Sequence, residues 1–226
     1  MILHECEQGS SKWLRLRCGL PTASEFHRIV TPGGKISQAQ EHYRNELLAE
    51  FMLGRPTDGV SMPWMDRGKE LEAEAVEFYE FTNDTTTERV GFITNDAKTY
   101  GASPDRLVGE KGLLEIKVPK PSTHIEYLLY KGVDERYRPQ LQGQLLVTGR
   151  DWVEILSYHP EMPPALVHVE RDEKYIKLLS EELDKFTEML EKLKAAFIEQ
   201  GYLKNQPEPP EFISDADLDA ILAARK

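Results

Sequence analysis

Apolar side chains recur at helical spacing in several long segments of the chain. Residues 173–200 carry an apolar residue every three or four positions, and Gly201 follows where a left-handed residue often ends a helix. Residues 38–53 show the same spacing before Gly54, and residues 67–81 carry an apolar stripe among many glutamates. The pattern therefore predicts a helix in each of these three segments.

Short runs rich in β-branched and apolar residues occupy the middle of the chain. Between residues 89 and 118, turn residues separate them at Asn95-Asp96, Gly101 and Gly109–Gly112. The clearest predicted strands are 113–119, 152–158 and 165–170. Residues 139–148 fit a further helix despite Gly143. The order helix, strands, helix, strands, helix predicts an α/β fold in which helices flank a mixed central β-sheet.

The end of the chain has a different composition. Residues 205–212, NQPEPPEF, are rich in proline and glutamate and indicate a linker without helix. Ser214 with Asp217 three residues later has the spacing of a capping box for a short helix, which either frays or docks on the body or a partner. We therefore assign residues 1–203 to one domain and residues 204–226 to a linker and a short C-terminal helix.

Cysteine, histidine and hydropathy patterns restrict the class of protein. Cys6 and Cys18 form no paired motif, and no two of the six histidines have H-x-x-x-H spacing, so a catalytic metal should have oxygen ligands. No apolar run approaches the roughly 20 residues that span a bilayer, and the first residues lack the basic start and apolar core of a signal peptide. We expect a protein of the reducing cytoplasm.

The net charge of −11 is unusual for a protein that binds nucleic acid, but the acidic residues are unevenly distributed. Residues 1–150 have a net charge of −3, whereas residues 151–226 have −8. Acidic metal ligands would account for part of the charge in the first segment. The composition therefore disfavours non-specific coating of DNA but allows a local basic channel.

The segment 101–120 carries the strongest candidate chemistry. Side chains alternate across a strand, so Glu115 and Lys117 share one face while Ile116 and its apolar neighbours face the other. A symmetric four-residue turn would place Arg106 opposite Glu115, whereas a shift of one residue or a bulge would bring Asp105 to that face. Sequence alone leaves both registers open.

Two carboxylates from adjacent strands would offer hard oxygen ligands for Mg²⁺, for which Mn²⁺ could substitute. The candidates are Asp105 and Glu115, and the backbone carbonyl of Ile116 could add a ligand. Lys117 would hold or deprotonate an attacking water during phosphodiester hydrolysis. Glu-x-Lys alone is typical of an exposed hairpin with a surface ion pair. Pro104-Asp105 ahead of it favours a metal site instead.

Pro104-Asp105 with Glu115-Ile116-Lys117 resembles the signature of the PD-(D/E)xK nucleases, which have a restriction-endonuclease-like core. Further blocks, in the same order, resemble lambda exonuclease and the related YqaJ-type viral recombinases over roughly residues 5–200. These blocks are WLRLRCG at 13–19, TASE at 22–25, RGKELE at 67–72 and QLQ at 140–142.

The resemblance implies roles for individual residues. Asp105, Glu115 and Ile116 would bind metal, Lys117 would act on the water, and Glu72 would support the metal or the nucleophile. From the residues alone, Glu72 fits equally well on a solvated acidic helix face.

A pocket for a 5′-terminal phosphate is also implied, formed by Arg17, Ser24, Ser103 and Gln140. An arginine with hydroxyl and amide donors suits a phosphate dianion. Ser24 could instead be an N-cap for a helix that begins at Glu25.

Two further implications concern the DNA end and the metal count. Met65 falls near the apolar residue that wedges into the duplex end in the family, although Met at such spacing is usually core. Asn95 or Asp96 occupies the region where an additional carboxylate of the family would lie, which puts a second metal ion in doubt.

The implied function is a processive, Mg²⁺-dependent 5′→3′ exonuclease on double-stranded DNA ends. It would act as a ring-shaped trimer in a bacterial or phage-infected cell, beside a single-strand annealing protein. An endonuclease of restriction or junction-resolving type uses the same core and is the first alternative. A non-catalytic recombination scaffold, whose acidic C-terminal third binds a partner, is the second.

Overall fold

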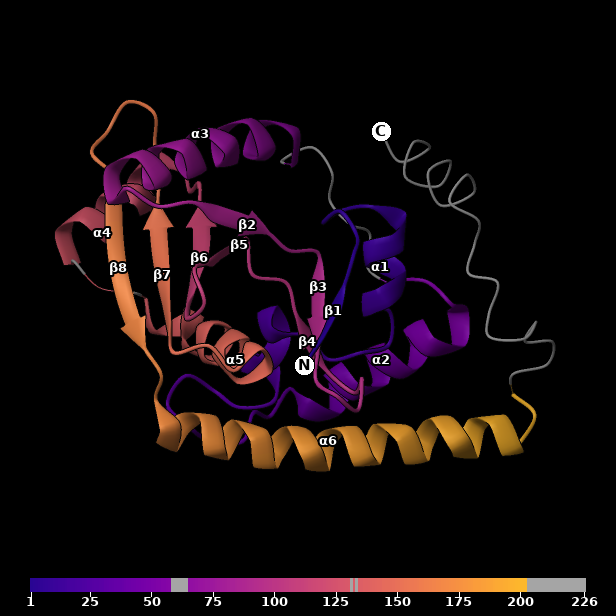
Figure 1. The fold of residues 1–226 in the computed structure, drawn as a ribbon. Helices are drawn as coiled ribbons and strands as arrows, with labels where there is room; N and C mark the ends of the chain where they lie inside the picture. Colours follow the sequence, from indigo (N-terminus) through magenta and orange to yellow (C-terminus); the bar gives the residue numbers. More distant parts are fainter. Residues whose placement is uncertain (58–64, 131, 133, 203–226) are drawn as a thin grey trace.

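The structure is a computed structural model that describes residues 1–57, 65–130, 132 and 134–202, with the side chains of residues 65–70 left out of the description (Figure 1). The predicted linker and short helix over residues 204–226 lie outside the described residues. Within the described part, no helix is both long and apolar enough to cross a membrane.

A five-stranded mixed sheet forms the centre of the molecule. Its strands, in spatial order, are β2 (Thr87–Arg89), β5 (Arg106–Val108), β6 (Gly112–Lys117), β7 (Trp152–Ser157) and β8 (Ala165–Glu170). β6 and β7 run parallel, and the other neighbouring pairs are antiparallel. The sequence prediction of a mixed central sheet is therefore confirmed.

Helices cover both faces of this sheet (Figure 1). On one face, α3 (Met65–Asn83) packs Ala75, Val76 and Tyr79 on Leu114 and Ile116 of β6. The opposite face packs on α5 (Arg138–Thr148), and α6 (Glu173–Glu199) lies beneath α5. β6 therefore has apolar contacts on both faces, as buried strands between helices require.

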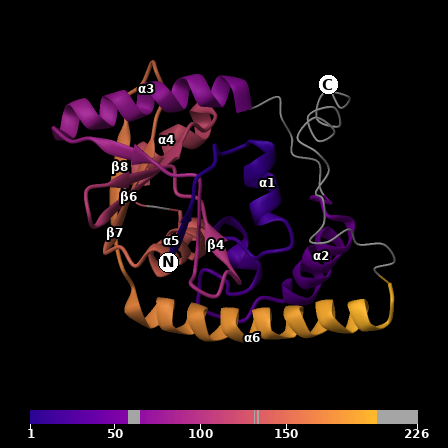
Figure 2. The same ribbon diagram turned by 45° about the vertical axis from the view of Figure 1, so that its right-hand side comes forward.

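A smaller three-stranded sheet, in the order β1-β3-β4, stands beside the central one. Its strands are β1 (Ile2–His4), β3 (Phe92–Thr94) and β4 (Gly101–Ala102). Figure 2 shows α1 (Ser11–Arg17) and α2 (Gln40–Leu53) on the side of the molecule away from β7 and β8. α2 is held to α6 by Tyr43 and Phe186, whose stacked rings have centroids 5.6 Å apart. The remaining elements are η1 (Ala23–Arg28), α4 (Pro121–Tyr130) and η2 (Glu135–Tyr137).

The helices predicted from apolar spacing are confirmed as α2, α3, α5 and α6, and their ends differ from the predictions by a few residues at most. The predicted stop signals also hold, since Gly54 and Gly201 have φ angles of 62° and 70°, in the left-handed region. The sequence patterns did not identify α1, β1 or α4, which are short and lack a sustained period. Ser24 lies inside η1, and the N-cap of η1 is Thr22. The alternative that Ser24 is an N-cap is therefore wrong.

Gly143 lies inside α5 because η1 packs directly against this point of the helix. A Cβ added to Gly143 would lie 2.4 Å from a ring carbon of Phe26, and Phe26 is fully buried. The ring has no room to move in a close-packed core. Gly143 thus allows the close approach of α5 and η1.

We expect Gly143→Ala to lower the free energy of unfolding by about 1–2 kcal/mol, because overpacking a core typically costs about 1–3 kcal/mol and the helix propensity of alanine offsets part of it. Urea unfolding followed by circular dichroism measures the change. Gly33→Ala is the matched control, since a Cβ there would have nothing within 4 Å. A Gly143→Ala protein as stable as wild type would show that the contact is not tight.

Candidate active site

A three-residue turn between β5 and β6 sets the register that brings Asp105 to Glu115. Val108 pairs with Gly112 and Arg106 with Leu114, so continuing the ladder by one residue places Asp105 beside Glu115. Gly109 opens the turn with a φ of 50°, a conformation that glycine adopts without strain. Of the two registers that the sequence allowed, the one-residue shift is observed, and the symmetric four-residue turn is wrong.

Asp105 lies just before the first residue of β5, and its side chain takes the place of a backbone partner for β6. Its Oδ2 accepts a hydrogen bond of 2.6 Å from the backbone N–H of Ile116. In an antiparallel ladder the N–H and C=O of one residue point to the same neighbouring strand. The carbonyl of Ile116 is therefore directed to the same side as Asp105, where it can serve as a ligand beside that carboxylate.

Glu115 is almost fully buried, with 3% of its surface exposed, and three side chains donate to its carboxylate. Lys117 Nζ and Gln140 Nε2 each donate to Oε1 at 2.6 Å, and Gln144 Nε2 donates to Oε2 at 2.7 Å. The two glutamines stand one helical turn apart on α5, so they present their amides from one face. This network fixes the orientation of Glu115.

Burial and the neighbouring charge of Glu115 raise the pKa of Asp105 well above its usual range. The hydrogen bond from Ile116 and the charge of Lys117 act in the opposite direction, and Glu72 adds to the increase. Burial alone would lower the pKa of Lys117, but the charges of Glu115 and Asp105 outweigh it and raise the pKa. Lys117 is therefore a protonated ammonium at neutral pH.

The donor set suits a hard divalent cation. Two neighbouring carboxylates, one buried and one partly buried, repel each other and are stabilised by a positive ion between them. Mg²⁺ takes one or two carboxylates and leaves other positions for water or phosphate. Among the described residues, no three His, Cys, Asp or Glu side chains are grouped closely enough to enclose a metal. The site thus offers Asp105, Glu115 and the Ile116 carbonyl, with an open side.

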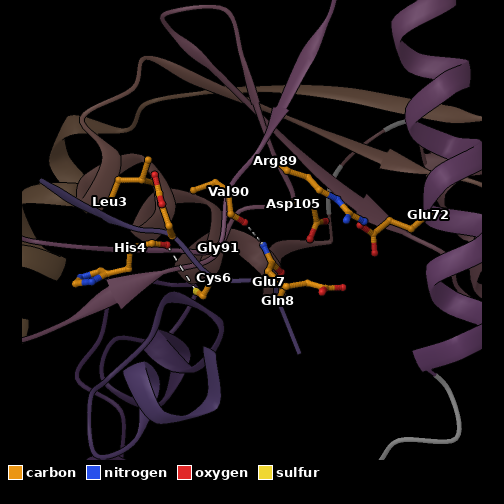
Figure 3. A pocket seen from close by; sticks show the side chains of 11 residues that line it. Leu3, His4, Cys6, Glu7, Gln8, Glu72, Arg89, Val90, Gly91 and Asp105 are labelled. Atoms are coloured by element: carbon orange, nitrogen blue, oxygen red, sulfur yellow. Dashed lines mark hydrogen bonds between the residues drawn. The ribbon is translucent and has the colours of Figure 1, made fainter. Parts of the chain in front are cut away.

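Glu72 and Asp105 line a hollow of about 290 Å³ between α3, β2 and the segment that follows β1 (Figure 3). Arg89, Gln8 and Cys6 are among its other lining residues. Glu72 extends from α3 toward this space and is near enough to Asp105 to affect its pKa. The structure therefore brings together all four residues predicted for catalysis.

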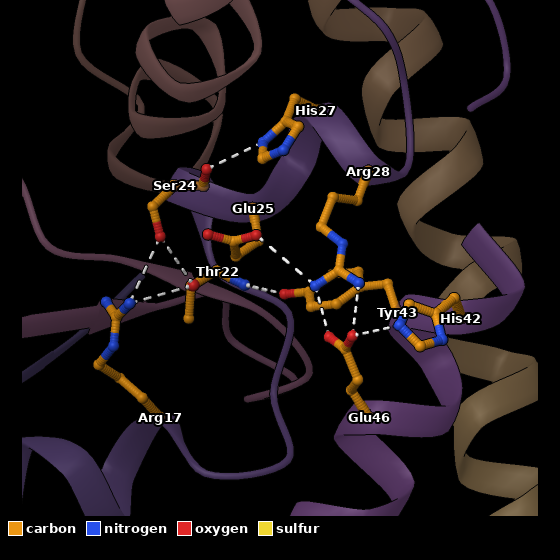
Figure 4. Close-up of polar contacts among 9 residues, drawn as sticks. All are labelled: Arg17, Thr22, Ser24, Glu25, His27, Arg28, His42, Tyr43 and Glu46. Carbon is orange, nitrogen blue, oxygen red and sulfur yellow. Dashed lines mark hydrogen bonds and ion pairs between the residues drawn. The ribbon is translucent and has the colours of Figure 1, made fainter. Parts of the chain in front are cut away.

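Arg17 forms a second cluster with hydroxyl groups. Its guanidinium donates to Ser24 Oγ at 3.4 Å and to Thr22 Oγ1 at 3.3 Å (Figure 4). It also donates to Ser103 Oγ at 3.4 Å. It also lies 4.0 Å above the Trp13 ring. Burial lowers the pKa of Arg17 to about 10, so it stays charged at neutral pH.

No ion pair neutralises Arg17 within the part of the chain that the structure describes, although Glu25 and Glu50 attract it from farther away. A cation enclosed by hydroxyl groups suits an anion with several oxygens. Three of the four residues predicted for the phosphate pocket, Arg17, Ser24 and Ser103, are thus in contact. The fourth, Gln140, is hydrogen-bonded to Glu115 instead.

The remaining predicted positions contribute less. The side chain of Met65, the suggested wedge, lies outside the described residues. Asn95 closes the β3–β4 turn by accepting from the N–H of Thr99, and Asp96 pairs with the N-terminal ammonium. Both side chains thus make local contacts at the β3–β4 turn and the N-terminus.

Sequence reasoning missed two residues that hold the site in place. Gln144 lies four residues after Gln140, and this spacing on a helix was the available signal. Trp13 donates from Nε1 to Ser103 Oγ at 2.8 Å, so it positions the hydroxyl that Arg17 contacts. No local pattern in the sequence indicated this polar partner of Trp13.

Comparisons with known proteins identify the relatives of this chain. The profile of the YqaJ-like viral recombinase domain matches residues 12–151. The crystal structure of an alkaline exonuclease from Laribacter hongkongensis, LHK-Exo, is similar with a TM-score of 0.75 and 29% identity, over 85% of this chain and 98% of that one. Its complex with dAMP gives a TM-score of 0.74 at 30% identity, with the same coverage of both chains.

A phage-related exonuclease from Haemophilus somnus 129PT shares the fold, with a TM-score of 0.63 and 15% identity over 79% of this chain and 96% of that one. The search of curated proteins gives no match. The matched profile spans more than half of the chain and includes Arg17, Asp105, Glu115 and Lys117. The chain therefore belongs to the YqaJ-like viral recombinase family, within the lambda exonuclease branch of the PD-(D/E)xK nucleases.

Proposed function

We propose that this protein is a metal-dependent exonuclease that digests one strand of double-stranded DNA from its 5′ end and leaves 3′ single strands for recombination by strand annealing. The family supports a nuclease role in recombination. One observation carries the narrower proposal. Ser103, which contacts Arg17, and Asp105, which adjoins Glu115, are two residues apart on one segment, so a terminal-phosphate site would lie next to the hydrolytic groups.

Asp105, Glu115 and the Ile116 carbonyl would hold the divalent ion, which we propose is Mg²⁺ with Mn²⁺ as a substitute. When bound, such an ion polarises the scissile phosphodiester and makes water a better nucleophile at neutral pH. Its charge would also offset the repulsion between Asp105 and Glu115, which is the reason for two acids at this place.

Lys117 would orient the attacking water. Its ammonium is held at 2.6 Å by Glu115 and lies 5.1 Å from the Tyr137 ring, so it has one well-defined position. Because the raised pKa keeps the proton on Nζ, Lys117 acts as a donor and a positive charge rather than as a free base. Gln140 and Gln144 fix the carboxylate of Glu115, and Glu115 in turn would fix Lys117 beside the reacting phosphate.

Arg17 favours an exonuclease over the endonuclease alternative. A cleft for cutting within a strand meets only phosphodiesters, each with one negative charge, whereas a strand end carries a phosphate monoester that is close to a dianion at neutral pH. A partly buried arginine surrounded by hydroxyl groups suits the terminal group. The family resemblance adds a trimeric ring, processive digestion and a single-strand annealing protein as partner, which we include in the proposal. The scaffold alternative leaves the Asp105, Glu115 and Lys117 arrangement without a purpose.

With Mg²⁺, we expect release of nucleotides from the 5′ ends of a linear duplex and no cutting of the same duplex as a closed circle. Asp105→Ala, Glu115→Ala and Lys117→Ala should each abolish release, because all three groups act on the reacting phosphate or water. End-labelled digestion with circular dichroism of each variant measures both activity and folding. Activity that persists in excess EDTA, or a folded variant with wild-type turnover, would contradict the proposed site, and cutting of the circle would favour the endonuclease.

Asp105→Asn should stabilise the metal-free protein at neutral pH while removing activity. Because the pKa of Asp105 is raised in the folded state, the protonated form of Asp105 stabilises the fold. This stabilisation is complete below the ordinary pKa of about 3.9 and is lost as the pH rises through the raised value. Relief of the buried charge should contribute about 1–3 kcal/mol. Urea unfolding in EDTA across pH 4–8 measures the difference from wild type.

The surface variant Asp151→Asn is the control, since Asp151 is half-exposed and pairs only with Lys111 among the described residues. It should leave the pH dependence unchanged. A wild-type protein that gains stability relative to Asp105→Asn as the pH rises would show that the acid is stabilised in its ionised form without metal.

Duplexes with a 5′-phosphate should be degraded faster than duplexes with a 5′-hydroxyl, by about ten- to a hundred-fold if the contact is made in the transition state. Arg17→Ala should remove most of this preference, because it deletes the central cation of the hydroxyl cluster. Arg15→Ala, two residues away on the same helix, should preserve it. Equal rates on both ends in the wild type, or a preference that survives Arg17→Ala, would remove the support for a terminal-phosphate pocket.

A further inference from the structure

Two arginines stand directly opposite each other at the edge of the central sheet. In the β2–β5 ladder, Arg89 of the edge strand pairs with Arg106, the residue that follows Asp105. Like charges directly opposite each other across a ladder are destabilising. The fold therefore keeps an unfavourable pair next to its candidate catalytic acid.

Neither arginine side chain forms an ion pair with another residue that the structure describes. Within the same part of the chain, the buried Nε of Arg106 has no hydrogen-bond acceptor. A buried donor without an acceptor has a free-energy cost of about 1–3 kcal/mol in known proteins, so it requires an explanation.

Nearby carboxylates attract Arg106 without forming an ion pair with it. Glu72, Glu80 and Asp105 all act on Arg106 electrostatically. Glu80, however, accepts from the N–H and the hydroxyl of Thr87 at 2.7 and 2.6 Å, which occupies its Oε1. These acids balance the charge of Arg106 at a distance, while its Nε donor has no acceptor among the described residues.

Arg89 faces the same hollow as the candidate catalytic acids. Figure 3 shows its side chain extending toward Glu72, with Asp105 beside it, and all three line the 290 Å³ space. Arg89 is on an edge strand and exposed, so a ligand in the hollow can reach it. The hollow is thus lined by the carboxyl groups of Glu72 and Asp105 and, next to them, by the positively charged Arg89.

Three groups of candidate contacts lie on one short segment. Ser103 contacts Arg17, Asp105 adjoins Glu115, and Arg106 pairs with Arg89 across the ladder. We propose that Arg89 binds the phosphodiester immediately 3′ of the scissile one on the digested strand, with Arg106 adding positive charge from the neighbouring strand. This inference rests on the proposed exonuclease function and extends it by a third phosphate position.

A different purpose for the pair would be to balance the charges of Glu72 and Asp105. The two roles differ in one respect. A charge-balancing arginine affects every substrate equally, whereas a phosphate-binding arginine matters only when the phosphate that it contacts is charged.

The test is a double-mutant cycle that combines one substitution in the protein with one neutral linkage in the DNA. Single-turnover release of the first nucleotide is measured, below saturation and with Mg²⁺, on a 5′-phosphorylated duplex and on the same duplex with a neutral methylphosphonate between the second and third nucleotides. Wild type should be slowed about ten- to a hundred-fold by the methylphosphonate. Arg89→Gln should be slowed by a similar factor on the normal duplex and should show little further loss on the modified one.

Lys192→Gln is the control, because Lys192 is an exposed cation on α6 that pairs with Glu188. It should retain the full sensitivity to the methylphosphonate. Arg89→Gln should also unfold at the same temperature as wild type or higher, since the substitution removes a like-charge contact.

Wild type that is insensitive to the methylphosphonate, or Arg89→Gln that keeps the full sensitivity, would overturn this inference while leaving the exonuclease proposal in place. Failure of wild type to release a nucleotide from either duplex would overturn the proposed function, and this inference with it.

Discussion

The repulsion between two carboxylates beside the middle strand of the central sheet governs the arrangement around them. Asp105 and Glu115 are brought together by the β5–β6 register, and burial together with the charge of Glu115 raises the pKa of Asp105. Such a pair is stable only if other groups supply positive charge or hydrogen-bond donors. Lys117, Gln140 and Gln144 supply them to Glu115, and the N–H of Ile116 supplies one to Asp105. The remaining electrostatic deficit is what a bound divalent ion would offset.

The fold meets this requirement by giving β6 two different faces. Leu114 and Ile116 pack on α3, while Leu113 and Glu115 face α5, which carries the glutamines. The same segment continues backward through Pro104 to Ser103 and the Arg17 cluster. The protein is acidic as a whole, yet its positive groups Arg17, Lys117 and Arg89 are placed around the acids, where a phosphate chain would need them.

Periodic sequence features predicted the structure wherever burial imposes a repeat. The stripe over residues 173–200 became α6, and the alternation around Glu115 correctly separated its two faces. The register of Asp105 could not be predicted, because it depends on a three-residue turn with Gly109 in the left-handed region, and both registers preserve the local pattern. Gln144 contacts Glu115, which is 29 residues away, and its helical spacing from Gln140 was the available signal. Trp13 contacts Ser103, which is 90 residues away, and no local signal encodes that contact. Arg89 was overlooked for the same reason, since its importance arises from Arg106 across the ladder.

Metal binding between Asp105 and Glu115 is the claim on which the proposed chemistry depends most directly. Diffraction data collected at the manganese absorption edge, from crystals soaked in Mn²⁺, would locate the ion without any assumption about activity. We expect an anomalous peak in contact with the Asp105 and Glu115 carboxylates and the Ile116 carbonyl, and no peak there in Asp105→Asn crystals. A well-ordered site with no peak at saturating Mn²⁺, or an equally strong peak after the Asp105→Asn substitution, would contradict the assignment of this carboxylate pair as the metal centre.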